Sequence, residues 1–277
     1  MSLSQVSRAL LERMSPIIAR ATEDDIRRAI ASDSPSALRD DALGLVQQGD
    51  YSAFFAPFDW ITDKADIVII GVTPGKQQAL EALLSFRAAL SGGVSLDEAA
   101  QRAKNAASFK GGMRTLGARL MDHFGLHRLF GLASTLDLFA GAAHRAHYTS
   151  VLRYPVLKRF GNYAGDSRIA VRPFMRRMIE ETLADELAML PKAWLVPFGP
   201  NALRALEYLA AAGRIDDARI LGGILHPGGQ QWNRYNVQLG LVSGDAALAV
   251  PGGPEVLRRS AVLRAKVAAL LGEGAGP

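Results

Sequence analysis

Thr73 lies in a turn, Gly71–Gly75 (GVTPG), at a position where a ligand could bind. The preceding run Ile67–Ile70 is apolar and β-branched with no polar alternation, which is typical of a strand buried on both faces of a parallel sheet. The helical pattern beginning at Lys76 puts the turn at the carboxyl edge of that sheet, where open α/β folds bind ligands. The same pattern also fits a plain strand-to-helix corner.

The histidines are the other side chains whose types could take part in chemistry. His123 and His127 are spaced i, i+4, His144 and His147 are spaced i, i+3, and His226 precedes a Pro-Gly-Gly turn. Neither pair lies in a motif with a metal-binding carboxylate, so we predict no metal and no other cofactor. The absence of cysteine excludes disulfides, thiolate zinc sites and iron–sulfur clusters. A histidine before a proline can also be a structural turn residue.

Basic residues exceed acidic residues by 32 to 27, which gives a net charge of +5. Part of the excess falls within twenty residues, at Lys158, Arg159, Arg168, Arg172, Arg176 and Arg177. A phosphate backbone is the natural partner of such a stretch, although a solvated helix face would look the same.

Composition indicates an ordinary globular chain. Its 277 residues are 49% hydrophobic and 21% charged. No apolar run is long enough to cross a bilayer, and the first residues lack the apolar core of a secretory signal. We therefore expect a cytoplasmic, monomeric protein with no membrane partner, forming a single domain over residues 1–277.

The order of elements predicts an α/β fold in three layers (α/β/α) around a central, mostly parallel four-stranded sheet. The strands are expected at 67–70, 146–152, 193–198 and 219–225. Helices are expected at 76–90, 95–107, 112–124, 173–190, 202–213 and 254–271. Residues 1–50 read as a helical N-terminal extension, and 153–167 as an exposed functional loop.

Five segments in this order resemble the motifs of the uracil-DNA glycosylase superfamily. They are GVTPG (Gly71–Gly75), Phe109-Lys110-Gly111 with its following helix, TSVLRYP (Thr149–Pro155), ELAMLPKAWLVPFGPNALRAL (186–206) and LHPGG (Leu225–Gly229). The resemblance covers about residues 55–240. It implies a DNA-repair enzyme that excises uracil, and possible action on other deaminated bases, by hydrolysis of the N-glycosidic bond.

The resemblance also implies roles for individual residues. His226 would donate a hydrogen bond to the uracil O2, and the Thr73 hydroxyl with the Val72 or Pro74 carbonyl would orient the attacking water, with Gln77 as the second candidate. Phe109 would stack on the extruded base, and Ser150 would read its polar edge. Gly71, Pro74, Gly75 and Gln77 would complete the substrate site. We expect the side chains of Thr73, Phe109, Ser150 and His226 to surround one base-sized hollow.

Contacts with DNA are expected from two further segments. Lys158, Arg159 and Arg168 would bind phosphates, and Gln231, Trp232 or Arg234, in the loop Gly228–Tyr235, would fill the vacated base stack. Both single- and double-stranded DNA are possible substrates. No lysine lies in a motif that could form a Schiff base with the sugar, so the enzyme would be monofunctional.

The chain departs from the family pattern in two motifs. Val72 and Thr73 stand where most members carry an Asp, Asn or Glu, and Ser150 replaces the base-reading asparagine. One alternative is therefore a protein of the same fold that binds uracil-containing or single-stranded DNA without excision, or that is trapped covalently through His226. Another is a small-molecule enzyme with a phosphate at the helix start that follows Gly71–Gly75.

Overall fold

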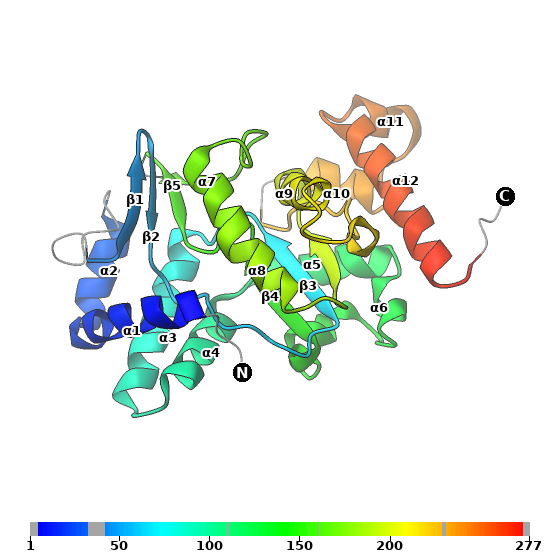
Figure 1. Ribbon diagram of the computed structural model, residues 1–277. Coiled ribbons are helices and arrows are strands. Elements are labelled where there is room, and N and C mark those ends of the chain that lie inside the picture. The colour runs from blue at the N-terminus through cyan, green and yellow to red at the C-terminus, as the bar shows by residue number, and fades with distance from the viewer. Residues whose placement is uncertain (1–4, 33–41, 110, 160, 229–230, 274–277) are drawn as a thin grey trace. The chain divides into compact units, whose positions relative to one another are not determined.

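The computed structural model describes residues 5–32, 42–109, 111–159, 161–228 and 231–273, and its elements are drawn in Figure 1. The predicted helix over part of 33–41, Lys110 of the second motif and Gly229 of the last motif lie outside these residues. The chain divides into two compact units. Each unit is described by itself, and the single-domain assignment stays a prediction.

The first unit comprises Met1–Asp63, Val72–Lys110 and Tyr148–Leu190. Its helices are α1 (Gln5–Arg20), α2 (Glu23–Ala31), α3 (Lys76–Ser91), α4 (Leu96–Ala107), α7 (Pro173–Met178) and α8 (Ala184–Ala188), the last two joined by a π-helical turn at Ile179–Leu183. Its strands β1 (Gly44–Gln48), β2 (Tyr51–Phe54), β5 (Val156–Lys158) and β6 (Gly161–Asn162) form an antiparallel sheet in the order β1-β2-β5-β6.

The predicted helical extension is therefore correct for α1 and α2 and wrong for Gly44–Gln48, which is strand β1. Gly49 and Asp50 connect β1 to β2 as a two-residue hairpin turn, and Gly49 has the positive φ of 56° that such turns require. This Gly-Asp turn signal was overlooked in the helical interpretation. Helix α2 begins with a capping box, in which the Thr22 side chain accepts from the Asp25 N–H and the Asp25 carboxylate accepts from the Thr22 N–H.

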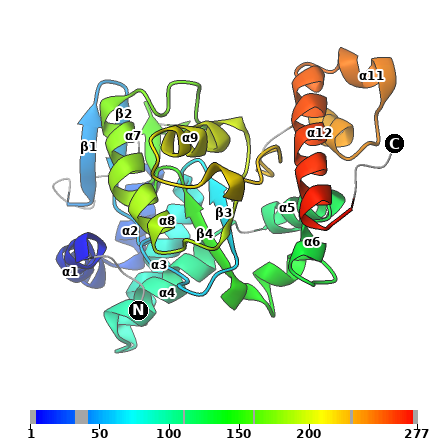
Figure 2. The same cartoon turned by 45° about the vertical axis from the view of Figure 1, so that its right-hand side comes forward.

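The second unit comprises Lys64–Gly71, Gly111–His147 and Pro191–Pro277. Its helices are α5 (Gly112–His123), α6 (Leu126–Leu129), α9 (Pro200–Ala211), α10 (Trp232–Gln238), α11 (Gly244–Ala249) and α12 (Gly253–Leu270), with short 3₁₀ helices at Thr135–Phe139, Ala143–Arg145 and Asp217–Arg219. Helices α10 and α12 pack against each other (Figure 2).

A parallel sheet in the order β4-β3-β7 consists of β4 (Ala146–Ser150), β3 (Ile67–Gly71) and β7 (Trp194–Pro197). Every residue of β3 is buried, as its unbroken apolar run predicts. The last three residues of β4 belong to the first unit. The α/β class and a parallel sheet are thus confirmed, while the three-layer arrangement stays a prediction.

The fourth parallel strand expected at 219–225 is reduced to a single bridge between Ile220 and Leu195. Two glycines explain the difference. A Cβ on Gly222 would lie 2.5 Å from the Leu203 side chain, and one on Gly223, whose φ is 133°, would lie 2.8 Å from the Arg259 carbonyl oxygen. These positions serve close packing against α9 and α12 rather than a pleated strand.

Candidate functional site

The turn that follows β3 is tied to the segment that follows β4. The Val72 carbonyl accepts a hydrogen bond from the Leu152 N–H at 2.9 Å. The Thr73 hydroxyl donates to the Tyr154 carbonyl at 3.1 Å and accepts from the Val156 N–H at 3.0 Å. Because a hydroxyl carries one proton and two lone pairs, Thr73 retains only an acceptor site with which to orient a water.

Substituting Thr73 with the isosteric valine is expected to lower the free energy of unfolding by about 1–3 kcal/mol, because the N–H of buried Val156 loses its acceptor. Urea denaturation measures the change. Thr115→Val, at an exposed position on α5, is the matched control and should stay within about 0.5 kcal/mol of the parent. Equal stabilities of the two variants would show that the Thr73 hydroxyl does not anchor this turn.

The start of α3 is capped by side chains. The Gly75 N–H donates to Gln78 Oε1 at 3.1 Å, and the Lys76 N–H donates to Asn162 Oδ1 at 2.9 Å. A Cβ on Gly75 would lie 3.2 Å from Asn162 Nδ2, so glycine permits this approach. Two of the donors that a phosphate would use at this helix start are therefore occupied, which argues against the small-molecule alternative.

Asn162 was missed in the sequence, where nothing connects it with a turn 86 positions earlier. It brings a carboxamide beside the first motif, which itself contains neither amide nor carboxylate. The other predicted substrate residues of this turn differ in exposure. Gly71 and Pro74 are buried, whereas Gln77 is exposed and donates from Nε2 to Glu81 Oε1 at 3.0 Å.

Phe109 and Ser150 are both associated with β4. The Phe109 ring lies edge-on to the Tyr148 ring, with centroids 6.2 Å apart, and Ser150 lies two residues further along the strand. Residues i and i+2 share one face of a strand, so Ser150 is on the same face as Tyr148. Phe109 has a φ of 47°, which is unusual for a bulky side chain and is the kind of strain found at functional sites.

Glu186 on α8 lies at the centre of a buried polar cluster in the first unit. Its Oε2 accepts from the Thr149 hydroxyl at 2.8 Å and from Arg153 Nη2 at 3.0 Å. Its Oε1 accepts from Lys104 Nζ at 3.3 Å. Thr149 and Arg153 bracket Ser150, and Lys104 lies on the helix that leads to Phe109, so one carboxylate connects both predicted base-contacting segments.

Asp59 completes this cluster, whose four charged side chains are at most 4% exposed. Its Oδ1 accepts from the Tyr154 hydroxyl at 2.6 Å and lies 3.6 Å from Arg153 Nη1. Burial raises the pKa of Asp59, with Arg153 opposing the shift. Burial also lowers the pKa of Lys104 to about 8, although Glu186 acts in the opposite direction.

The exposed loop predicted at 153–167 is therefore wrong for its first part. Arg153, Tyr154, Val156 and Leu157 are buried, and exposure begins at Lys158. Arg153, the first arginine of the segment, lies in the buried cluster around Glu186, and nothing in the sequence indicates this burial.

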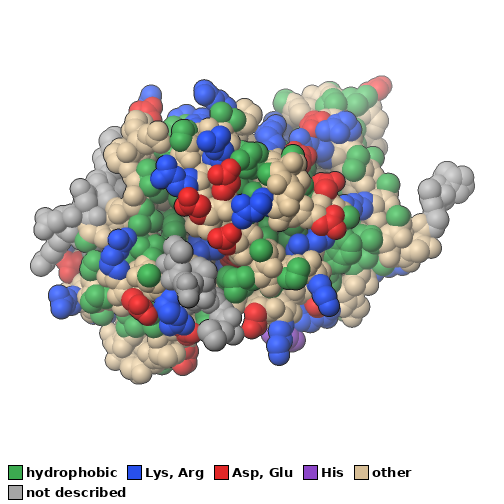
Figure 3. Space-filling model, viewed as in Figure 1, with side chains coloured by type: hydrophobic (Ala, Val, Ile, Leu, Met, Phe, Trp, Pro, Cys, Tyr) green, Lys and Arg blue, Asp and Glu red, His purple; other side chains and the backbone are tan. Residues whose placement is uncertain are grey.

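The predicted phosphate-binding cations lie on the hairpin of β5 and β6 or after it. Lys158 Nζ lies 5.8 Å from the centre of the Tyr51 ring. Arg159, with a φ of 55°, occupies the turn between β5 and β6 and reaches Asp50 at 3.5 Å. Arg168 is exposed. On the face drawn in Figure 3, basic and acidic side chains are interspersed.

His226 belongs to the second unit, at the end of the segment that was expected to be the fourth strand. Its Nδ1 accepts a hydrogen bond from the Gly228 N–H at 3.0 Å, so Nδ1 carries no proton. Burial lowers the pKa of His226 below its usual 6.5. The ring is therefore neutral at pH 7 and carries its proton on Nε2, which makes Nε2 a hydrogen-bond donor.

The position of this imidazole is fixed by its neighbours. The Tyr235 hydroxyl donates to the His226 carbonyl at 2.7 Å. A Cβ on Gly228 would lie 2.9 Å from His226 Cε1, and a Cβ on Gly199 would lie 3.1 Å from His226 Cβ. Gly199 also has a φ of 88°, so two glycines allow the backbone to close around the ring.

The loop predicted at Gly228–Tyr235 is wrong for its second half, because α10 begins at Trp232. Trp232 is 64% exposed, a high value for this side chain in a globular protein. Arg234 donates from Nε to the Pro251 carbonyl at 2.7 Å and from Nη1 to Gln231 Oε1 at 3.3 Å.

Among the residues that the structure describes, no three His, Asp or Glu side chains come together as a possible metal site. Within the same part of the chain, no helix has the length and apolar character needed to cross a membrane. In one of the two histidine pairs noted in the sequence, His123 Nε2 lies 3.2 Å from Arg264 Nη2, and His127 Nδ1 lies 3.6 Å from Asp122 Oδ1.

The chain is similar to a protein of Bacillus subtilis over most of its length. No protein-family model matches the chain, and no solved structure matches it. A protein of Bacillus subtilis (strain 168) named "Uncharacterized protein YoxB" is 31% identical over 202 residues, which are 72% of this chain and 79% of that protein. At this identity and coverage, the chain belongs to the same family as Bacillus subtilis YoxB.

Proposed function

We propose that this protein is a monofunctional DNA glycosylase that excises uracil from DNA, with other deaminated bases as further candidate substrates. The observation that carries the proposal is the state of His226: a neutral imidazole whose tautomer is set by the Gly228 N–H. The motif order of the sequence supplies the reaction class. Lys104, whose pKa is lowered, is 2% exposed and bonded to Glu186, which agrees with a mechanism without a Schiff base.

The reaction requires stabilisation of a separating charge. When the bond between uracil N1 and the sugar C1′ breaks, its electron pair goes to the base and positive charge develops on the sugar. A neutral Nε2–H of His226 would donate to O2 as that oxygen becomes anionic, without first having to lose a proton. Water then adds to C1′ and releases a proton, and the DNA phosphates favour the sugar cation.

Recognition of the base is assigned to the first unit. Phe109 would stack on the extruded base, and Ser150 would form one hydrogen bond as donor and one as acceptor. An asparagine side chain offers more hydrogen bonds, so we expect looser discrimination among deaminated bases. The same proposal includes contacts with DNA by six further residues: Lys158, Arg159, Arg168, Gln231, Trp232 and Arg234.

The second candidate function is uracil or single-stranded DNA binding without excision. It is favoured by the first motif, where the Thr73 proton is bonded to the Tyr154 carbonyl and the Val72 carbonyl accepts from Leu152. Covalent trapping through Nε2 of His226 is less compatible with the site. The Nδ1 contact to Gly228 leaves the proton, rather than a lone pair, on Nε2.

A uracil-containing oligonucleotide, treated with the protein and then with alkali, separates these functions. Strand scission at the uracil position, absent from the matched thymine oligonucleotide, is the expected result. Binding without scission would support the second candidate, and an adduct that survives denaturation would support covalent trapping. An absence of both binding and scission would refute the DNA-directed reading altogether.

A further inference from the structure

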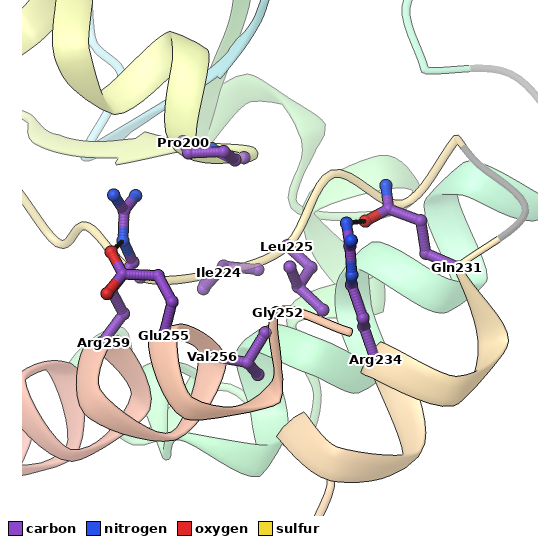
Figure 4. A pocket seen from close by; sticks show the side chains of 11 residues that line it. Pro200, Ile224, Leu225, Gln231, Arg234, Gly252, Glu255, Val256 and Arg259 are labelled. Atoms are coloured by element: carbon purple, nitrogen blue, oxygen red, sulfur yellow. Dashed lines mark hydrogen bonds and ion pairs between the residues drawn. The ribbon is translucent and has the colours of Figure 1, made fainter. Parts of the chain in front are cut away.

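A cavity of about 170 Å³ opens in the second unit beside the segment that precedes His226 (Figure 4). Its walls come from the start of α9, the segment 223–225, α10 and the start of α12. The apolar part of the lining, called the floor below, consists of Pro200, Ile224, Leu225 and Val256, with Pro200 across the hollow from Val256. His226 does not line it, so this hollow is separate from the imidazole described above.

The volume of the cavity limits what it can hold. An apolar cavity of about 150 Å³ accepts one benzene ring. A space of about 170 Å³ therefore suits a single six-membered ring and is small for a fused two-ring system. The aliphatic side chains of the floor would contact the faces and edges of such a ring.

The rim of the cavity is positively charged. Arg234 and Arg259 lie on opposite sides of it, as Figure 4 shows. The Nε of Arg234 donates to the Pro251 carbonyl, and the Nε of Arg259 donates to Glu255. Each guanidinium group is thus held through its Nε atom. Arg234, Arg259 and Glu255 are the charged side chains of the lining, so the rim keeps a surplus of positive charge.

We propose that this cavity binds a pyrimidine nucleotide unit, with the base on the apolar floor and the phosphate between Arg234 and Arg259. A guanidinium matches the geometry of phosphate oxygens, and a phosphate matches the surplus charge of the rim. The Gln231 amide at the rim offers a donor for a base carbonyl. The unit is either a free mononucleotide or part of a DNA strand, and only the second source rests on the proposed function.

Calorimetric titration with thymidine 5′-monophosphate tests this site, since thymine is not a base that the proposed enzyme excises. The parent protein should bind it, and Arg259→Ala should weaken binding about tenfold to a hundredfold, as expected for loss of a hydrogen bond to a charged group. Arg258→Ala is the matched control: it removes the same charge and the same Glu255 partner but does not line the cavity. Its affinity should stay within about twofold of the parent, as expected for an exposed charge.

Two further measurements test the size of the base that the cavity accepts and the source of the nucleotide. Deoxyguanosine 5′-monophosphate should bind more weakly than the thymidine nucleotide, and Val256→Phe, which fills the floor, should abolish binding of both. Tighter binding of oligothymidine, lost in Arg259→Ala, would identify a DNA strand as the source. Equal affinity of the oligonucleotide and the mononucleotide would identify the free nucleotide.

The proposal fails if the parent does not bind thymidine 5′-monophosphate, or if Arg258→Ala and Arg259→Ala weaken binding equally, because the attraction is then general. Equal binding of the guanine nucleotide would remove the assignment to pyrimidines. Excision is not measured in this titration, so its outcome is separate from that of the proposed function.

Discussion

Replacement of Glu186 by glutamine is expected to lower the free energy of unfolding by about 3–5 kcal/mol, the usual effect of breaking a buried ion pair from one side. The variant keeps the shape of the side chain but leaves Lys104 and Arg153 with Asp59 as the one buried counter-charge among the described residues. Chemical denaturation of the purified protein measures the loss. A smaller loss for Glu186→Gln than for Glu186→Ala would separate the charge from the packing of the side chain.

Glu255→Gln is the matched control, because Glu255 also binds two cations but does so at the surface of α12. Exposed ion pairs contribute about 0–1 kcal/mol, so this variant should be nearly as stable as the parent. If both glutamine variants lost the same stability, the buried position of Glu186 would have no special effect. If neither lost stability, the cluster would not hold the segments of Ser150 and Phe109 together.

Elements defined by a local pattern could be predicted from the sequence. The run Ile67–Ile70 has no polar alternation, and it is a fully buried strand in a parallel sheet. The segments 193–198 and 95–107 contain β7 and α4 within a residue at each end. In each case the hydrophobic period and the turn or cap residues lie within the element itself.

Features that depend on distant residues could not be predicted. Gly222 and Gly223 interrupt the expected fourth strand because of what packs against them, and the packing partners Leu203 and Arg259 lie elsewhere in the chain. Packing therefore overrides the local pattern at this segment. Strand β1 is a different case, because its partner β2 follows directly after the Gly49-Asp50 turn, and pairing with β2 decides between strand and helix.

The residues of the candidate site also divide into those indicated by a local pattern and those that depend on distant contacts. Thr73 is indicated by the turn that follows a buried strand, and His226 by the Pro-Gly-Gly turn after an expected strand that the structure does not form. Their states depend on contacts: the Thr73 hydroxyl on the backbone of 154–156, and the imidazole tautomer on the Gly228 N–H. Asn162 lies in none of the five motif segments, and Glu186 opens the fourth, but nothing in the sequence indicates that they contact Lys76 and Thr149.

Substitution of His226 by alanine is expected to lower the excision rate by about 10²–10³-fold, the usual loss when one preorganised donor to a developing anion is removed. DNA binding should change little, because the donor acts on charge that develops during bond cleavage. Single-turnover excision from a uracil oligonucleotide and binding of the same oligonucleotide are the two measurements. His144→Ala, at an exposed histidine of the second unit, is the control and should excise like the parent.

The pH dependence tests the protonation state assigned to His226. Burial lowers its pKa, so the ring stays neutral from alkaline pH down to below 6.5. A neutral donor predicts an excision rate that is flat between about pH 7 and 8 and falls only when the ring is protonated and its Gly228 contact is lost. A rate that declines steadily as the pH rises through this interval would instead require a charged imidazole. Equal losses of excision and DNA binding in His226→Ala would remove the histidine from the chemical step.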